Sequence, residues 1–191
     1  MTTQPVTANG VRAPLDAGTW TIDAAHTLVE FSVRHMTIAR VTGRFGAVSG
    51  RVVVPEDNPL GATVTAEIDV ASVSSGHPKR DELIRSADFL DVDNFPVMVF
   101  HSEPAVPVAD GRWRIPGELT IKGVSRPVEL DATFEGVISH RGATRAGFSA
   151  MTEINRREFG VTWNGTLDAG GAVVSDTIRI TLEVELVRAE R

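Results

Sequence analysis

The chain has 191 residues, 42% of them hydrophobic, which suits one domain with a sizeable core. It contains no cysteine, which excludes disulfides and thiolate metal sites. Its formal net charge of −6 argues against nucleic acid as the main partner, because binding to phosphates needs a basic surface.

Residues 1–17 are rich in Thr, Pro, Ala and Gly, and we expect them to form a flexible N-terminal leader. They contain neither a charged start nor an apolar run of the length that a secretion signal needs. No window of the chain approaches the roughly 20 apolar residues of a membrane span. We therefore expect a cytoplasmic location, no integral membrane span, and a single domain over residues 18–188.

Apolar and polar residues alternate along most of the chain, with the period of two that is typical of strands with one buried face. The alternating segments are residues 19–22, 29–35, 52–54, 64–70, 113–121, 128–136, 147–154 and 178–186. Residues 97–101 also read as a strand, but four consecutive apolar residues leave its facing open. Residues 36–41 are interpreted as a bend or loop. The pattern amounts to about eight strands.

One segment departs from this rhythm. Residues 78–86 (PKRDELIRS) combine good helix formers with a proline near the start, which predicts one short helix. The loop that follows contains three large apolar residues, Phe89, Leu90 and Phe95, and these must be covered somewhere. We expect them to act as a lid or plug at one end of the fold.

The pattern excludes a helical bundle and a parallel sheet, because it has no long 3.6-residue period and no strand–helix–strand rhythm. Antiparallel strands with one apolar face form a sandwich or a barrel. The near absence of helix to cover that face favours a sheet that closes on itself. We therefore predict an all-β fold, an extended antiparallel β-barrel of about eight strands with one short helix near residues 78–86. A barrel of this size holds either packed side chains or one ligand.

The sequence contains no motif for a nucleophile elbow, zinc-protease helix, phosphate-binding loop or dinucleotide-binding turn. The five histidines form no short-range ligand pair. His35 shares a face with Val33 and Phe31, and we interpret it as a core histidine or a polar contact to a ligand. His26, three residues after Asp23, is expected to stabilise a turn. We expect no catalytic residues, no metal and no cofactor, with acid–base work by His35 or His26 as an alternative.

Several arginines are candidates for contact with an anionic head group, because the guanidinium offers forked donors to phosphate. The run Asn155-Arg156-Arg157-Glu158 follows an alternating strand, and a solvated loop is the alternative reading. The candidates are Arg44, Arg156 and Arg157.

Five short stretches of the chain carry a family resemblance. They are IDAAHTLVEFSVRH (22–35), GRF (43–45), SADFLDVDNFPVMVFHS (86–102), LTIKGVSRPVELD (119–131) and INRREFGV (154–161). In this order they resemble the YceI-like family of polyisoprenoid-binding proteins, over roughly residues 18–187. The resemblance implies a lipocalin-like barrel with a long apolar pocket for a polyisoprenoid, an isoprenoid quinone or a fatty-acid-like ligand. It implies binding rather than turnover, with Met98, Phe100 and Ser102 facing inward.

The candidate pocket lining consists mainly of aromatic and aliphatic residues at inward positions. These residues are Phe31, Val33, His35, Phe45, Met98, Phe100, Phe134, Phe148 and Trp163. We expect a carrier, storage or sequestering protein for a long-chain amphiphile. The alternatives are a filled barrel that serves as a structural or interaction module, possibly as a homodimer, and an enzyme that acts on an amphiphile. Periodicity does not separate a filled barrel from a hollow one, because both require apolar inward faces.

Overall fold

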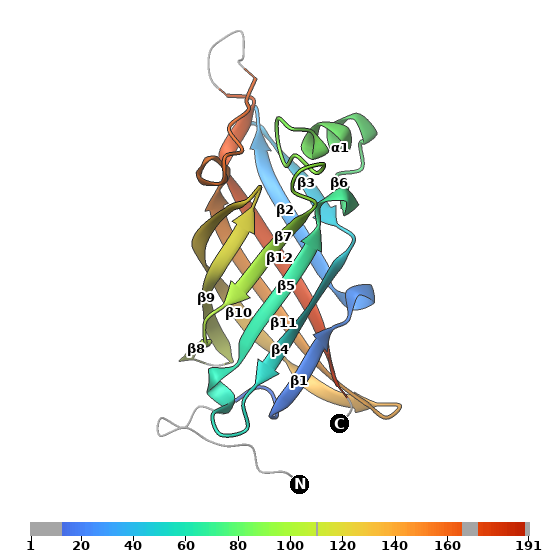
Figure 1. Ribbon diagram of the computed structural model, residues 1–191, viewed down its shortest axis with the longest axis vertical. Coiled ribbons are helices and arrows are strands. Elements are labelled where there is room, and N and C mark those ends of the chain that lie inside the picture. Colours follow the sequence, from blue (N-terminus) through green and yellow to red (C-terminus); the bar gives the residue numbers. More distant parts are fainter. Residues whose placement is uncertain (1–12, 110, 166–171, 190–191) are drawn as a thin grey trace.

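The computed structural model describes residues 13–109, 111–165 and 172–189. They form an antiparallel β-barrel that is longer than it is wide (Figure 1). The sheet closes because β12 pairs with β11 along one edge and with β1 along the other. Around the ring the strands are β1 (Gly18–Ile22), β4 (Val48–Val54), β5 (Thr63–Asp69), β7 (Val97–Ser102), β9 (Arg112–Ile121), β10 (Val124–His140), β11 (Ala143–Asn155) and β12 (Val174–Arg188). The predicted all-β, lipocalin-like barrel of about eight strands is confirmed.

Several of these strands do not run the full length of the barrel. Shorter strands continue the wall beyond their ends. These strands are β2 (Leu28–His35), β3 (Ala39–Phe45), β6 (Val73–Ser74) and β8 (Val106–Ala109). Short 3₁₀ turns link the strands, namely η1 (Ala24–His26), η2 (Pro59–Gly61), η3 (Val70–Ser72) and η4 (Arg156–Phe159). The long strand β12 pairs with β1 through its C-terminal part and with β2 through the rest. The barrel thus keeps a continuous wall although its individual strands bend.

The β9–β10 hairpin shows how the chain turns between strands. Its loop contains only Lys122 and Gly123, which both have positive φ (52° and 71°), as a two-residue hairpin requires. The alternation predicted strands that end at residue 121 and resume at residue 128, so the gap between them is too long in that prediction. Pro127 lies within β10 opposite Glu118, in a part of β10 that β11 does not pair with. A proline is tolerated there because its missing N–H faces no neighbouring strand.

The predicted helix is confirmed as α1 (Pro78–Arg85), with Pro78 in its first turn. Figure 1 shows α1 at one end of the barrel, called here the α1 end, and β1 at the opposite end, called the β1 end.

The prediction of a loop over residues 36–41 is wrong in part, because β3 begins at Ala39 and pairs there with His35. None of the helices in the described part of the chain is long and apolar enough to cross a membrane.

The packed domain begins earlier than the predicted boundary at residue 18. Ala13 and Leu15 are buried at the β1 end, with 2% and 4% of their surface exposed. The indole Nε1 of Trp20 donates a hydrogen bond to the backbone oxygen of Asp16 at 3.0 Å. Arg188 donates to the backbone oxygen of Ala17 at 2.8 Å and lies over the Trp20 ring. The rest of the predicted leader, residues 1–12, lies outside the described residues.

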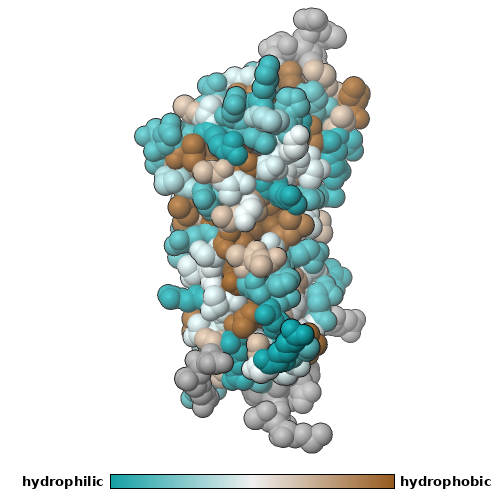
Figure 2. All heavy atoms as spheres, turned by 90° about the vertical axis from the view of Figure 1, so that its right-hand side faces the viewer, coloured by the Kyte–Doolittle hydropathy of each residue, from teal (hydrophilic) through white to brown (hydrophobic). Residues whose placement is uncertain are grey.

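Two clusters of buried side chains hold the barrel together. The cluster toward the α1 end contains Phe45, Met98, Phe100 and Phe159, and the cluster at the β1 end is built around Trp20. Both lie inside the wall, because alternate residues of each strand point inward. The outer face in Figure 2 is largely hydrophilic, with hydrophobic residues gathered near its middle.

Candidate functional site

The barrel encloses a cavity of about 450 Å³. Its lining is overwhelmingly apolar and comes from strands all around the wall. At the β1 end the cavity reaches Leu15 and Trp113, and at the α1 end it reaches Leu83 and Phe89. Inward side chains such as Phe31 are only half-buried, because empty space rather than another side chain faces them. The interior is therefore hollow, which does not fit a filled barrel.

Most of the pocket lining proposed from the sequence does face this cavity. The residues that line it are Phe31, Val33, His35, Phe45, Met98, Phe100, Phe148 and Trp163. Phe134 is the exception. Its ring packs on Phe148, with centroids 5.2 Å apart, in the cluster at the β1 end.

The position of Phe31 explains why residue 43, the first residue of the GRF stretch (43–45), is a glycine. Phe31 and Gly43 stand opposite each other in the β2–β3 register. The Phe31 ring lies so close to Gly43 that a Cβ atom at that position would collide with it. The ring also packs on Phe45, with centroids 5.6 Å apart. Glycine is therefore needed at residue 43 to give the aromatic ring its place on the cavity wall.

The hollow itself arises from small residues on the inner face, a signal that the search for large apolar residues missed. Ala132 on β10 and Ala150 on β11 stand directly opposite each other and both line the cavity. Ala66 on β5 lines it from another part of the wall. Methyl groups at such positions cannot reach across the barrel, so the space in front of them stays open.

The α1 end of the cavity is covered by α1 and the loop after it. Leu83, Ile84, Phe89 and Leu90 line the cavity there, and the Phe89 ring packs on Trp163 with centroids 5.2 Å apart. Two of the three predicted plug residues are thus at the cavity.

The third predicted plug residue, Phe95, instead lies against Gly123 of the β9–β10 turn. The cover is attached to the wall by Arg85, which donates to the backbone oxygens of Ala71 and Val73 at 2.9 and 2.6 Å. Lys122 donates to the backbone oxygen of Ala87 at 2.7 Å. These bonds hold α1 and its loop over the barrel end.

Arg156 lies beside the cavity, but its guanidinium is already occupied. The side chain is 4% exposed and donates to the backbone oxygens of Val161 (2.9 Å), Trp163 (2.7 Å) and Ser175 (3.0 Å). It also bonds the Asp176 carboxylate at 3.2 Å. Burial lowers the pKa of Arg156, and Asp176 partly opposes this. The arrangement joins η4 and the loop after it to β12, and leaves no donor pointed at a ligand.

The other two head-group candidates do not reach the cavity. Arg44 is exposed on the outer face of β3, because strand alternation sends its inward neighbour Phe45 to the interior instead. Arg157 is half-exposed and lies 3.8 Å from Asp176 on the outside of η4. The structure therefore does not place Arg44, Arg156 or Arg157 as free cations at the cavity.

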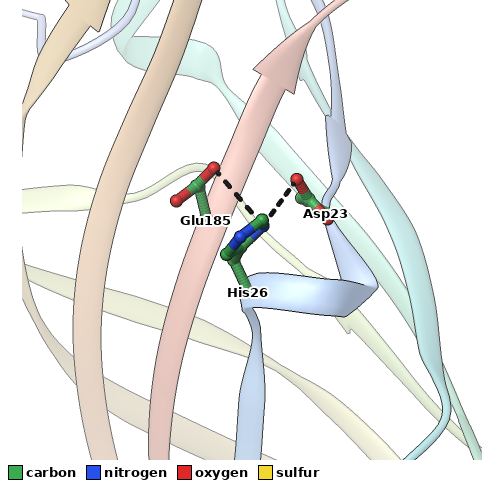
Figure 3. Close-up of side chains that lie close together, drawn as sticks. All are labelled: Asp23, His26 and Glu185. Atoms are coloured by element: carbon green, nitrogen blue, oxygen red, sulfur yellow. Dashed lines mark hydrogen bonds and ion pairs between the residues drawn. The ribbon is translucent and has the colours of Figure 1, made fainter.

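The two histidines singled out from the sequence have separate surroundings. His35 lines the cavity near its α1 end. His26 is outside the cavity in η1, where its Nδ1 lies 3.0 Å from Asp23 Oδ2 and 3.9 Å from Glu185 Oε1 (Figure 3). The turn-stabilising interpretation of His26 fits this geometry, since Asp23 also accepts a hydrogen bond from the Ala25 N–H.

Asp23, His26 and Glu185 form a group that could in principle hold a metal ion. The two carboxylates already share a cation, because Arg145 Nη1 bonds Asp23 at 2.7 Å and also bonds Glu185. Arg145, followed by His26, lowers the pKa of Asp23 to about 2. Hydrogen bonds and ion pairs within this group therefore join η1 to the neighbouring strands β11 and β12.

Comparison with known proteins identifies the family. A model of the YceI-like domain matches residues 20–186. The chain belongs to the YceI-like domain family. A UPF0312 protein from Vibrio cholerae is 32% identical over 149 residues, which cover 76% of this chain and 79% of that protein.

Solved structures agree with this assignment. The Campylobacter jejuni YceI protein is 28% identical, with a TM-score of 0.70, covering 82% of this chain and 90% of that one. A polyisoprenoid binding domain from Saccharophagus degradans has the same fold, with 16% identity and a TM-score of 0.68, covering 89% of this chain and 98% of that one. The YceI-like resemblance inferred from the five sequence stretches is thereby confirmed.

Proposed function

We propose that the chain binds the hydrocarbon tail of a long-chain amphiphile inside its barrel, as a carrier, storage or sequestering protein. The observation that carries the proposal is the 450 Å³ apolar hollow, which lies in the range of roughly 300–1,000 Å³ that small-molecule pockets occupy. An empty apolar cavity has no structural benefit, because its lining loses packing partners. A tail that fills it restores those contacts.

The ligand classes are a polyisoprenoid, an isoprenoid quinone or a fatty-acid-like chain. The fold neighbour from Saccharophagus degradans is described as binding a polyisoprenoid, which supports placing a prenyl chain first. Two arginines line the cavity, and both bond protein oxygens: Arg156 bonds backbone oxygens and Asp176, and Arg80 bonds Ser75. The buried part of the ligand is therefore uncharged. Its polar head stays toward an end of the barrel.

Binding is driven by removal of apolar surface from water. A tail that covers several hundred Å² gains roughly 25 cal/mol per Å², and only part of this appears as affinity after the chain is ordered. The selectivity expected from such a pocket is for tail length and shape rather than for charge. A cytoplasmic location and a homodimer stay predictions from the sequence.

Ala150→Phe tests the proposal directly. The new ring would project from β11 into the hollow opposite Ala132, and it should reduce the lipid that copurifies with the protein. Met151→Phe is the matched control, because Met151 is the next residue on the same strand and is 41% exposed on the outer face. Native mass spectrometry should detect a bound lipid in the unaltered protein and in Met151→Phe, but little in Ala150→Phe. Equal lipid in all three would refute the cavity as the site.

A further inference from the structure

The turn between β2 and β3 carries the most exposed large hydrophobic residue of the described chain. The turn consists of Met36, Thr37 and Ile38, and the Ile38 side chain is 83% exposed while Met36 is 39% exposed. Met36 and Thr37 both have positive φ, 51° and 61°, where glycine or asparagine is the usual residue. The chain thus keeps exposed side chains on a turn with a strained backbone, which buries none of them.

Exposed arginines lie on the two strands that carry this turn. Arg34 and Arg40 face each other directly across the β2–β3 pair, and Arg44 lies on the same outward face of β3. Neither Arg34 nor Arg40 makes an ion pair with another described residue. Like charges directly opposite each other in a sheet are destabilising. Residues 28–45 contain three arginines and a single acidic residue, Glu30, although the whole chain has a net charge of −6.

The turn also lies beside the α1 end of the cavity. The Met36 N–H donates to the backbone oxygen of Val173 at 2.8 Å, and Val173 lines the cavity. His35 and Val41, on the two strands that carry the turn, line it as well. Figure 1 shows β2 rising to the same end of the barrel as α1. Whatever binds the turn is therefore brought to this end of the cavity.

We propose that this turn and its arginine collar, Arg34 and Arg40, dock the protein on an anionic phospholipid bilayer. A small apolar tip with basic residues just behind it matches the interface, where apolar side chains enter the acyl boundary and cations meet acidic head groups. A turn of three residues offers too little area for a stable protein partner, which needs roughly 800 Å² on each side. Charge interactions are screened beyond about 8–10 Å at physiological salt, so the arginines next to the turn act on head groups that touch it more than the net charge of the whole chain does.

Cosedimentation with vesicles tests this proposal. The purified full chain should bind vesicles of equal parts phosphatidylglycerol and phosphatidylcholine, and should bind phosphatidylcholine vesicles weakly. Each arginine near the surface contributes roughly fivefold, so Arg34→Gln with Arg40→Gln should weaken binding about 25-fold. Ile38→Ser should weaken it about tenfold. Raising the salt should weaken binding by the unaltered protein but have little effect on the double arginine variant.

Matched controls come from the opposite end of the barrel. Ile138 is a 63% exposed isoleucine near the tip of the β10–β11 hairpin, so Ile138→Ser removes a similar side chain away from the collar. Arg112→Gln with Arg141→Gln removes the same charge at the β1 end. Both controls should bind vesicles as the unaltered protein does. Equal losses in controls and test variants, or no preference for phosphatidylglycerol, would overturn the proposal.

Two further readouts separate this proposal from its rivals. Docking does not require an occupied cavity, so Ala150→Phe should bind vesicles normally even if it carries no lipid. If Ile38→Ser instead changes the oligomeric state measured by light scattering, the turn is an interface between copies and bilayer docking is refuted. Circular dichroism of each variant establishes that the exposed substitutions leave the barrel folded.

Discussion

Replacing Arg156 tests whether this buried cation serves the fold or a ligand. The structure assigns it to the fold, since its donors bond three backbone oxygens within 3.0 Å as well as Asp176. Arg156→Met keeps the aliphatic stem but removes every donor. The buried oxygen of Val161 then loses its hydrogen bond, and a bond to a charged group contributes about 1.5–3 kcal/mol. Because several such bonds are lost together and water replaces only some of them, we expect the free energy of unfolding to fall by about 3–5 kcal/mol.

The neighbouring residue is a suitable control. Arg157 is half-exposed, and its contact with Asp176 spans 3.8 Å, so Arg157→Met should change the free energy of unfolding by less than about 1 kcal/mol. Urea unfolding followed by circular dichroism measures both variants. Native mass spectrometry of the folded fraction of Arg156→Met should still detect bound lipid. A stable Arg156→Met protein that has lost its lipid would contradict the structural role and restore the head-group hypothesis.

Other substitutions test the packing and the charges of the wall. Gly50→Ala should lower the free energy of unfolding by about 1–3 kcal/mol in urea titrations, because its Cβ would collide with the backbone oxygen of Thr65; an unchanged midpoint would contradict this close approach. Leu15→Ala should lower it by about 2–5 kcal/mol, whereas a flexible segment there would show no loss. The pKa of Asp23 is about 2, below its usual 3.8, because of Arg145 and then His26, so this carboxylate stabilises the fold above pH 4 and stops doing so as the pH falls toward 2. The urea midpoint of Asp23→Asn should therefore lie below that of the unaltered protein at pH 6 and meet it near pH 2, and a constant difference would argue against the shift.

The fold was largely predictable because strand alternation is a local property of the sequence. On β9, Leu119 and Ile121 are buried, whereas Glu118, the residue before Leu119, is exposed. This is the alternation that a period of two requires. Alternation is weaker at the ends of strands. The start of β3 at Ala39 does not follow from the pattern, because Ala39, Arg40 and Val41 come directly after a turn of three residues and read as a continuation of that loop.

The candidate site was only partly predictable, because it depends on contacts between distant segments. Ala132 and Ala150 stand opposite each other on β10 and β11, and this pair leaves open space in front of the neighbouring inward residues. The pairing depends on the register of the two strands, which neither strand's sequence gives alone. The role of Arg156 depends on backbone oxygens that include Ser175, brought to it by the fold. An arginine in a polar run is typical of a solvated loop, and nothing local distinguishes one that is buried.

Tryptophan fluorescence offers the most direct test that a hydrocarbon tail enters the barrel. Trp113 and Trp163 line the cavity, whereas Trp20 is buried in the cluster at the β1 end. A long-chain lipid with bromine atoms on its tail quenches only the indoles that the tail contacts. We predict saturable quenching at about one lipid per chain, much reduced in Ala150→Phe. Absence of quenching, or quenching that rises without saturation and equally in Ala150→Phe, would contradict the binding of a tail inside the barrel.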